Sequence, residues 1–218
     1  MKKERRYKTS HLLEDQYEPG SGKRVLKNLR GIKRKREMDR EEVLAQLRAF
    51  EEVTKIYGAQ HKFTEKDICD IHKIWLGKIY SWAGQYRSVN ISKGGFSFAA
   101  AREIPKLMGE FERDVLYKYT PCCSSSQDEM ALALAIVHVE LVLIHPFREG
   151  NGRMSRVLAI LMALQGGLPV LDFGSIQGKK KAKYFAAVRA GLSRDYRLMT
   201  EIFKGVIKRT VRKFSSMS

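Results

Sequence analysis

The chain has 218 residues, of which 44% are hydrophobic, and its 41 lysines and arginines against 24 aspartates and glutamates give a net charge of +17. This length and apolar content suffice for one sizeable core, and no stretch rich in Pro, Ser and Gly is long enough to be an interdomain linker. Three cysteines, Cys69, Cys122 and Cys123, are too few and wrongly spaced for a disulfide framework or a zinc site. The charged N-terminus lacks the apolar segment of a signal peptide, so the cytoplasm is the expected compartment.

Positive residues gather in four runs, and such a charge suits a partner that is acidic or is nucleic acid. Apart from Tyr7, the runs contain no aromatic residue, and no signature of a nucleic-acid-binding fold accompanies them. We therefore favour solvated basic faces over direct nucleic-acid binding, which remains an alternative. The runs lie at residues 2–8, 23–40, 179–183 and 204–213.

The first predicted elements are two helices and a hairpin. Asp39 with Glu42 caps a helix that reaches about residue 57, and Thr64 begins another that reaches about residue 79. Apolar residues on either side of Ser92-Lys93-Gly94-Gly95 then form the pattern of a β-hairpin with a glycine-containing turn. Taken alone, this pattern is typical of an ordinary surface hairpin.

A third helix is expected at residues 104–119, followed by a central helix at residues 131–144. The central segment is nearly all apolar, and Ser126 with Glu129 forms a capping box before it. Because a bilayer-spanning helix needs about 20 apolar residues, we expect this shorter segment to lie in the protein core rather than in a membrane. Two C-terminal helices complete a mostly α-helical protein.

Residues 145–156 read His-Pro-Phe-Arg-Glu-Gly-Asn-Gly-Arg-Met-Ser-Arg and predict a phosphate-binding site. Glycine tolerates the positive φ of a concave turn, so Gly150-Asn151-Gly152 can direct backbone N–H groups at an anion. Apolar residues at helical spacing follow, which places the turn at a helix N-terminus with Arg153 and Arg156 on one face. His145 is expected at the last turn of the preceding helix. Each feature alone is common in ordinary helix ends, but their order within one short window favours the site.

The pattern His-x-Phe-x-Glu-Gly-Asn-Gly-Arg-x-x-Arg is similar at every defining position to the signature of the Fic (filamentation induced by cAMP) family. Residues 17–32 and 82–96 resemble the family's N-terminal segment and its β-hairpin flap, so the likeness covers about residues 17–205. The resemblance implies a mostly α Fic fold, a helical bundle around a central helix-loop-helix motif with a small flap. We expect a basic N-terminal arm and lead-in segment at residues 1–36 and a single Fic domain at residues 37–218, with its core at about 37–205.

The resemblance implies a protein adenylyltransferase, which moves AMP from ATP to a Ser, Thr or Tyr hydroxyl of a target protein and releases pyrophosphate. His145 is the expected base, because a neutral imidazole with an ordinary pKa of about 6.5 can take the proton of the attacking hydroxyl. Glu149 supplies the oxygen ligand that Mg²⁺ prefers. Phe147 is expected to plug the core and fix the height of the loop. The expected phosphate ligands are Gly150, Asn151 and Gly152, with Arg153 and Arg156 on the β- and γ-phosphates.

In this family the flap pairs with an extended stretch of the target, which adds a strand to a free edge and brings the hydroxyl to the histidine. Tyr184 lies in a segment that resembles the family's helix after the motif, where an aromatic residue can sit near adenine, with core packing as the alternative. Ser92 and Lys93 are also candidates for nucleotide contacts. The expected target-docking residues are Asn90, Ile91, Ser92, Lys93 and Gly94.

Two other functions remain open. Doc relatives transfer the γ-phosphate instead of AMP, but they lack the second motif glycine and the last arginine, which are present here as Gly152 and Arg156. The other alternative is a non-catalytic basic protein that binds DNA, which would show a steep dependence of duplex affinity on salt.

Many Fic proteins are restrained by a helix of pattern Ser/Thr-x-x-x-Glu-Gly/Asn, whose glutamate pairs with the second motif arginine, here Arg156. The chain has Ser10-His-Leu-Leu-Glu14-Asp15, with Asp15 where Gly or Asn belongs. This leaves either a weak internal brake through Glu14 or a small acidic antitoxin that supplies the glutamate, and we favour the antitoxin. By resemblance, the chain is then the toxin of a toxin–antitoxin pair, with a type II topoisomerase as the leading target.

Overall fold

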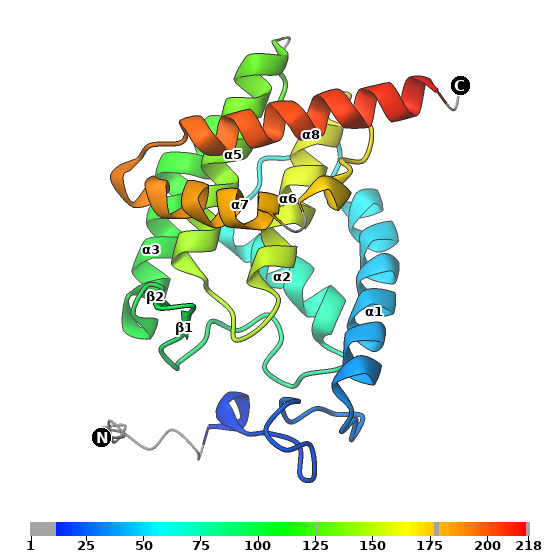
Figure 1. Cartoon of the computed structure of the whole chain (residues 1–218), viewed down its shortest axis with the longest axis vertical. Coiled ribbons are helices and arrows are strands. Elements are labelled where there is room, and N and C mark those ends of the chain that lie inside the picture. Colours follow the sequence, from blue (N-terminus) through cyan, green and yellow to red (C-terminus); the bar gives the residue numbers. More distant parts are fainter. Residues whose placement is uncertain (1–11, 125, 177–178, 217–218) are drawn as a thin grey trace.

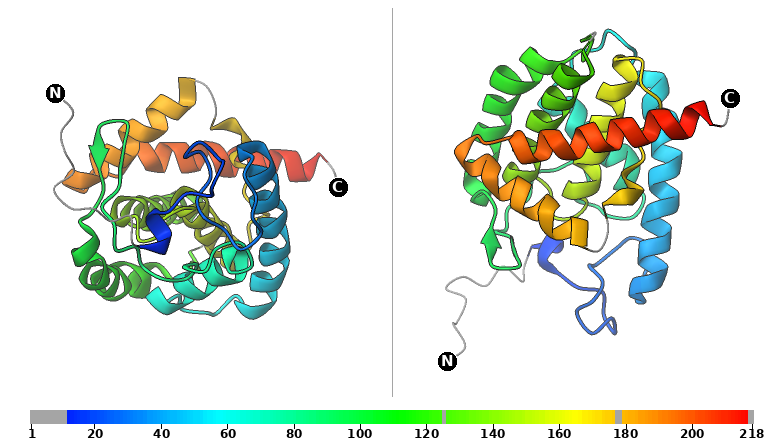
Figure 2. Two further views of the ribbon diagram at one scale, coloured as in Figure 1. Left: turned by 90° about the horizontal axis from the view of Figure 1, so that it is seen from below. Right: turned by 45° about the horizontal axis from the view of Figure 1, so that its top comes forward.

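The computed structural model describes residues 12–124, 126–176 and 179–216, which form a helical bundle with one small hairpin (Figure 1). Helices α5 (Gln127–Ile144) and α6 (Asn151–Gln165) run in opposite directions through its middle, joined by the loop at residues 145–150. Viewed from below, the other helices surround this pair (Figure 2). The mostly α fold predicted from the sequence is confirmed.

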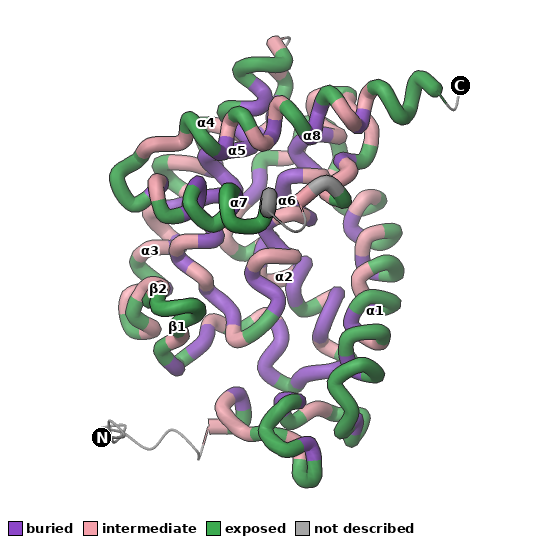
Figure 3. Tube along the Cα trace, in the orientation of Figure 1, coloured by how far each residue is buried: buried purple, intermediate pink, exposed green. Residues whose placement is uncertain are grey.

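Helix α5 is central because it is apolar on all sides. Twelve of its 18 residues are buried, and it packs against α3, α6, α7 and α8. Its N-terminus is capped by the Ser126 side chain, which accepts a hydrogen bond from the Glu129 N–H. The other half of the predicted capping box is missing, because the Glu129 carboxylate accepts from the Ser124 hydroxyl instead of the Ser126 N–H. The buried part of the chain follows α5, α6 and the faces that surrounding helices turn toward them (Figure 3).

Helices α1 (Lys35–Ile56) and α2 (Glu65–Leu76) flank this pair. For α2, Thr64 and Asp67 form a capping box, so the predicted start is confirmed. The predicted cap of α1 is wrong. The helix begins at Lys35, where Arg34 provides no side-chain cap, and Asp39 and Glu42 lie inside it. Glu42 is turned inward because Tyr80 and Arg153 both donate hydrogen bonds to its carboxylate.

The flap is an antiparallel hairpin of β1 (Ser92–Lys93) and β2 (Phe96–Ser97). Its turn consists of Gly94 and Gly95, with φ of 56° and 76°. A two-residue hairpin turn that requires positive φ at both positions selects glycine at each. The predicted hairpin is present, although Ser92 and Lys93 belong to its first strand rather than to the turn.

The predicted helical segment at residues 104–119 is present as α3 (Ile104–Phe111), a π-helical stretch (Glu112–Leu116) and α4 (Tyr117–Tyr119). The two predicted C-terminal helices are α7 (Lys179–Ala190) and α8 (Arg197–Ser215). Short 3-10 turns occur at Leu13–Asp15, Ala101–Glu103, Phe173–Ser175 and Gly191–Ser193.

The lead-in segment, residues 12–34, crosses beneath the 145–150 loop (Figure 2). Val25, Leu26 and Ile32 anchor it in a second hydrophobic cluster with residues of α1 and α2. Arg148 of the loop donates from Nε to the backbone oxygen of Glu14 at 2.9 Å. The segment therefore supports the loop from outside the bundle.

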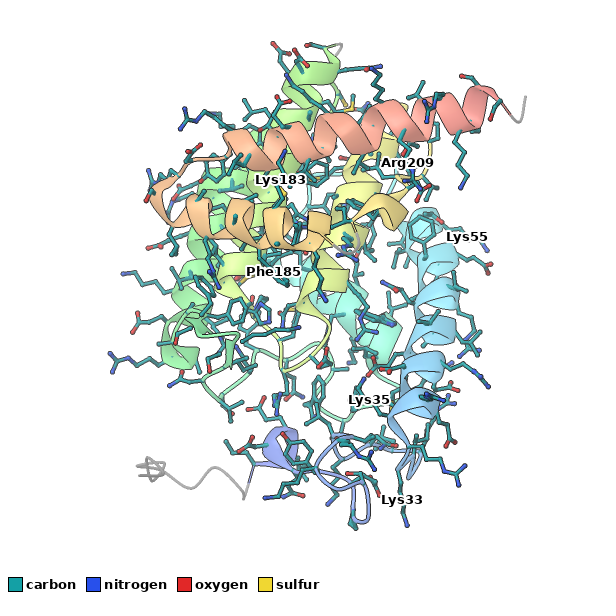
Figure 4. The ribbon with its side chains drawn as sticks, in the orientation of Figure 1. Lys33, Lys35, Lys55, Lys183, Phe185 and Arg209 are labelled. Carbon is teal, nitrogen blue, oxygen red and sulfur yellow. The ribbon has the colours of Figure 1, made fainter. Side chains whose placement is uncertain are left out.

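Basic side chains lie on the periphery of the bundle (Figure 4). Lys33, Lys35 and Lys55 are exposed at and before α1, and Lys183 is exposed on α7. In the part of the chain that the structure describes, none of the helices has the length and apolar character that a membrane crossing requires. The three cysteines all lie in that part and are free thiols.

Candidate active site

His145 lies directly beyond the last residue of α5, in the left-handed conformation with φ 54°. Its backbone N–H still bonds to the Leu141 oxygen at 3.0 Å, and its Nδ1 lies 3.1 Å from the Val142 oxygen. A carbonyl oxygen can only accept, so this bond assigns the ring proton to Nδ1. Nε2 then carries a lone pair, and no described residue bonds to it. The imidazole is thus arranged to accept a proton at Nε2.

The ring of Phe98, just after the flap, stacks on the His145 imidazole, with ring centroids 3.6 Å apart and planes 16° apart. Burial is the main cause that lowers the pKa of His145 to about 4, and the charges of Arg87 and Lys93 act in the same direction. Burial disfavours the charged imidazolium. His145 is therefore neutral at pH 7, as a general base must be before it reacts.

Arg87 is a buried guanidinium, 2% exposed, that binds backbone carbonyls rather than a carboxylate. Its Nε donates to the His145 oxygen at 2.8 Å, and its Nη atoms donate to the oxygens of Val89 at 2.6 Å and Ala99 at 2.7 Å. Ile144 receives a fourth, longer bond of 3.4 Å. One side chain thereby joins the end of α5 to both arms of the flap.

The loop after His145 rests on His72 of α2. His72 accepts from the Gly84 N–H at Nδ1, 2.9 Å, so its Nε2–H donates to the Glu149 oxygen at 3.1 Å. Its ring stacks on the fully buried Phe147, with centroids 3.8 Å apart. Burial lowers the pKa of His72 to about 4, so it keeps this neutral tautomer. Phe147 is buried against His72 and so packs the loop onto α2.

The Gly150-Asn151-Gly152 turn forms the N-terminus of α6, with Gly150 at φ 85°. The Asn151 side chain accepts from the Phe147 N–H at 2.8 Å and donates to the Phe147 oxygen at 2.7 Å. Both ends of this side chain are therefore used to close the loop. A phosphate at this turn would contact the backbone of Asn151 rather than its side chain. The N–H groups of Asn151 and Gly152 have no partner among the described residues. Unpaired N–H groups at the positive end of a helix dipole suit an anion.

Arg156, the second motif arginine, has no carboxylate partner within the described part of the chain. Its Nε is buried without a hydrogen bond, and its guanidinium lies 5.8 Å from the Phe173 ring centroid and 5.9 Å from that of Tyr184. A buried donor without a partner is costly. Among the described residues, no group compensates this buried donor and its charge.

Tyr184 lies in the core, 6% exposed, beside Arg156. Its hydroxyl donates to Nε2 of His138 at 2.9 Å, and His138 Nδ1 lies 3.2 Å from the Ser155 oxygen. Tyr184 thus packs against α5 and α6, which agrees with core packing, the alternative to an adenine contact given in the sequence analysis. A contact with adenine stays a prediction.

Arg153 and Glu149 form the exposed side of the turn. Arg153 Nη2 lies 2.6 Å from Glu42 Oε2 and 3.5 Å from Glu149 Oε1, and its guanidinium covers the Trp75 ring at 4.7 Å. The Glu149 side chain is 47% exposed. Among the described residues, no three metal-ligating side chains cluster together. A single accessible carboxylate fits Mg²⁺, which takes one or two carboxylates beside substrate phosphates and water.

The flap residues lie at the rim of the site. Ser92 and Lys93 are exposed, Asn90 accepts from the Ala101 N–H at 2.8 Å, and Ile91 accepts from the Phe98 N–H at 3.2 Å. The charge of Lys93 is close enough to His145 to lower its pKa. Strand β1 pairs with β2 on one side only, which leaves its other edge without a strand partner in the described chain.

Glu14 is not paired with Arg156. Its carboxylate accepts from the backbone N–H and the hydroxyl of Ser88, at the base of the flap. The proposed pattern for an internal brake begins at Ser10, which lies outside the described residues. In this structure Glu14 supports the flap, and it provides no restraint on Arg156.

Four residues of the site went unrecognised in the sequence: Glu42, His72, Arg87 and Phe98. Their partners lie far along the chain: His145 is 58 positions after Arg87, and Arg153 is 111 positions after Glu42. Arg87 falls within the segment that resembles the flap, which is the only signal that pointed toward it.

The chain was compared with known proteins. Residues 62–163 match the model of the Fic/DOC family. The protein adenylyltransferase VbhT of Bartonella schoenbuchensis is 29% identical over 197 residues, which cover 88% of this chain and 38% of VbhT. The protein adenylyltransferase Fic of Drosophila ananassae is 28% identical over 151 residues, 69% of this chain and 29% of that protein. The chain thus spans less than two fifths of the length of these curated relatives.

Solved structures share the fold. The N-terminal Fic domain of a Bartonella effector protein from Bartonella sp. AR 15-3 has a TM-score of 0.73 at 18% identity, covering 93% of this chain and 95% of that domain. BepC from Bartonella tribocorum, solved with bound AMPPNP, has a TM-score of 0.69 at 22% identity, covering 90% and 97%. Residues 62–163 include α2, the flap and nearly all of the helix-loop-helix, so the part of the chain that forms the candidate site is the part that matches the Fic/DOC family model.

Proposed function

We propose that this chain transfers AMP from ATP to a Ser, Thr or Tyr hydroxyl of a target protein and releases pyrophosphate. The observation that carries the proposal is the state of His145, whose neutral ring is held by the Val142 carbonyl with Nε2 free to accept a proton. The names of VbhT and of the Drosophila Fic protein, both protein adenylyltransferases, support it.

In the proposed reaction, the target hydroxyl oxygen attacks the α-phosphorus of ATP while Nε2 of His145 takes its proton. A bond forms between that oxygen and the α-phosphorus, and the bond from the α-phosphorus to the bridging oxygen of pyrophosphate breaks. The backbone N–H groups of Asn151 and Gly152 hold phosphate oxygens at the α6 N-terminus. Arg156, which has no carboxylate partner among the described residues, binds the negative charge of the leaving pyrophosphate with Arg153.

Glu149 is the residue that would hold Mg²⁺, which when bound supplies positive charge to the phosphates. Its accessible carboxylate supports this assignment. The flap would position the target, because an extended segment can pair with the free edge of β1 at Asn90–Gly94.

We further propose that the chain acts in a reducing cytoplasm as the toxin of a toxin–antitoxin pair, with a type II topoisomerase as its target. Three free thiols are compatible with that compartment. An acidic antitoxin that carries a glutamate to Arg156 would suit both the net charge of +17 and the absence of a described carboxylate beside this arginine.

The test is labelling by the purified chain in a bacterial lysate with Mg²⁺ and ATP labelled on either the α- or the γ-phosphate. We expect α-label on protein, a mass increment equal to AMP on the modified residue, and no label with His145→Ala. His61→Ala is the matched control, because His61 binds Asp67 away from the loop. Label from the γ-phosphate alone would instead establish a Doc-like phosphotransferase. The absence of both labels together with salt-dependent DNA binding would establish the non-catalytic alternative.

A further inference from the structure

The buried carboxylate of Glu42 lies behind the phosphate site, and the proposed chemistry assigns it no role. Glu42 is on α1, 3% exposed, and 111 residues before Arg153, to which it is joined by a 2.6 Å bond. Its other oxygen accepts from the Tyr80 hydroxyl at 2.6 Å. Its backbone oxygen accepts from Trp75 Nε1 at 2.9 Å. Both carboxylate oxygens and the backbone oxygen of Glu42 therefore have hydrogen-bond partners.

A buried carboxylate is costly to desolvate unless it is paired and hydrogen-bonded. Burial and the charge of Glu42 both raise the pKa of Tyr80, so the phenol stays protonated and keeps donating. The carboxylate is therefore held from the side opposite to Arg153. The pair is rigid on the Glu42 side and accessible on the Arg153 side, since the Arg153 side chain remains 28% exposed.

The Arg153 guanidinium is restrained on two sides. Glu42 takes one N–H of Nη2, and the Trp75 ring covers one face at 4.7 Å. Guanidinium has five N–H donors in a fixed plane, so one bond to Glu42 leaves most of them available. Nε and Nη1 have no partner among the described residues. Glu149 is the second carboxylate near Arg153, but its contact is longer, 3.5 Å, and its side chain is half exposed.

We infer that Glu42 is the positioning residue for Arg153: with Tyr80 and Trp75 it holds the guanidinium in one orientation, so that its free N–H groups meet the β- or γ-phosphate of the nucleotide. This inference rests on the proposed function. An arginine that is already ordered loses less rotamer freedom when the phosphate binds, which strengthens binding. The internal ion pair differs from a brake, because it engages Arg153 rather than Arg156 and leaves most donors free.

The test compares the affinity of the purified chain for AMPPNP and for AMP, both with Mg²⁺, by calorimetry. Glu42→Gln keeps the shape of the side chain but replaces a charge-assisted bond by a neutral one. We expect AMPPNP affinity to fall about tenfold, the difference between charged and neutral hydrogen bonds. AMP, which lacks the phosphates that Arg153 would reach, should bind Glu42→Gln and the unsubstituted chain equally.

Glu41→Gln is the matched control. It removes the same charge from the neighbouring residue of α1, where Glu41 pairs with Arg30 and Arg48 at the surface. Its AMPPNP affinity should be unchanged. A double-mutant cycle supplies the second criterion: in an Arg153→Ala background, Glu42→Gln should have less than about a twofold effect, because the group it acts through is gone.

Equal losses for AMPPNP and AMP, or the same loss with and without Arg153, would show that Glu42 only maintains the fold and would overturn the inference. Tyr80→Phe, which removes one hydroxyl bond to the carboxylate, provides the same test by a gentler change, with an expected loss of about threefold. If the unsubstituted chain binds AMPPNP while neither variant differs from it, the inference alone fails. If the unsubstituted chain binds no AMPPNP, the proposed function fails with it.

Discussion

Arg87 holds His145 by its backbone, through a 2.8 Å hydrogen bond from Nε to the His145 carbonyl oxygen. The same guanidinium reaches the carbonyl oxygens of Val89 and Ala99 on the two arms of the flap. His145 and the flap therefore share one anchor. Arg87 thus fixes the flap relative to His145 through bonds outside the two short strands of the hairpin.

The first prediction concerns this anchor. Arg87→Ala leaves several buried carbonyl oxygens without donors, and we expect it to lower the free energy of unfolding by about 3 kcal/mol or more. Arg87→Lys should recover only part of this, because one ammonium cannot reach all the oxygens. Urea denaturation measures the change. The control is Arg102→Ala, an exposed arginine paired with Glu103 beside the flap, expected within about 0.5 kcal/mol of the unsubstituted chain.

A second prediction concerns the turn before α6. Gly150 has φ 85°, and a Cβ there would lie 2.9 Å from the Trp75 ring. Gly150→Ala should therefore lower the free energy of unfolding by about 2 kcal/mol or more, through backbone strain and steric overlap. Gly109→Ala in α3, where a Cβ meets nothing within 4 Å, should raise it by up to about 1 kcal/mol. Similar midpoints of thermal unfolding for the two variants would contradict this account.

The third prediction is a loss of stability in mild acid. Burial lowers the pKa of His72, His138 and His145 to about 4 in the folded chain, below the ordinary value of about 6.5 that applies when unfolded. Between these values the unfolded chain binds more protons, so stability is complete above pH 6.5 and decreases as the pH falls toward 4. At pH 5 the loss should be about 2 kcal/mol per histidine.

Urea denaturation at pH 7.5 and pH 5.0 measures this loss. His138→Gln removes one of the three groups, and the denaturation midpoint of this variant should depend less on pH. A denaturation midpoint that stays constant between the two pH values would show that these histidines are not buried as described.

The fourth prediction rests on the proposed function and concerns the pH dependence of AMP transfer. A base must be deprotonated, and the pKa of His145 is lowered to about 4. Log kcat/KM should therefore stay level from pH 8 to pH 5.5, whereas an unperturbed histidine would cost about tenfold at pH 5.5. Phe98→Ala exposes the imidazole to water, so its pKa should rise and an acidic limb should appear. An acidic limb near pH 6.5 in the unsubstituted chain would contradict the buried, neutral base.

Several features were predictable because each depends on residues close together in the chain. The Thr64 capping box spans four residues, the glycine turn of the flap spans two, and α5 is recognisable from a nearly continuous apolar stretch. The loop after His145 is equally local, since Asn151 closes it by bonding to Phe147 four residues away. The start of α1 was misplaced because Asp39 and Glu42 match the residue types and spacing of a helix cap. Glu42 instead accepts a hydrogen bond from Arg153, far along the chain.

The sequence by itself determined the helix-loop-helix motif, its glycine turn and the residue types suited to phosphate, because these follow from backbone preferences over a few residues. Only the tertiary structure decided which protonation state His145 has, which arginine is paired and which is free, and what orients each. Those properties come from Phe98, Arg87 and Glu42, which reach the motif through helix packing across tens of residues. Burial and long-range pairing leave no pattern among neighbouring residues in the sequence. They depend on how the surrounding helices pack around α5.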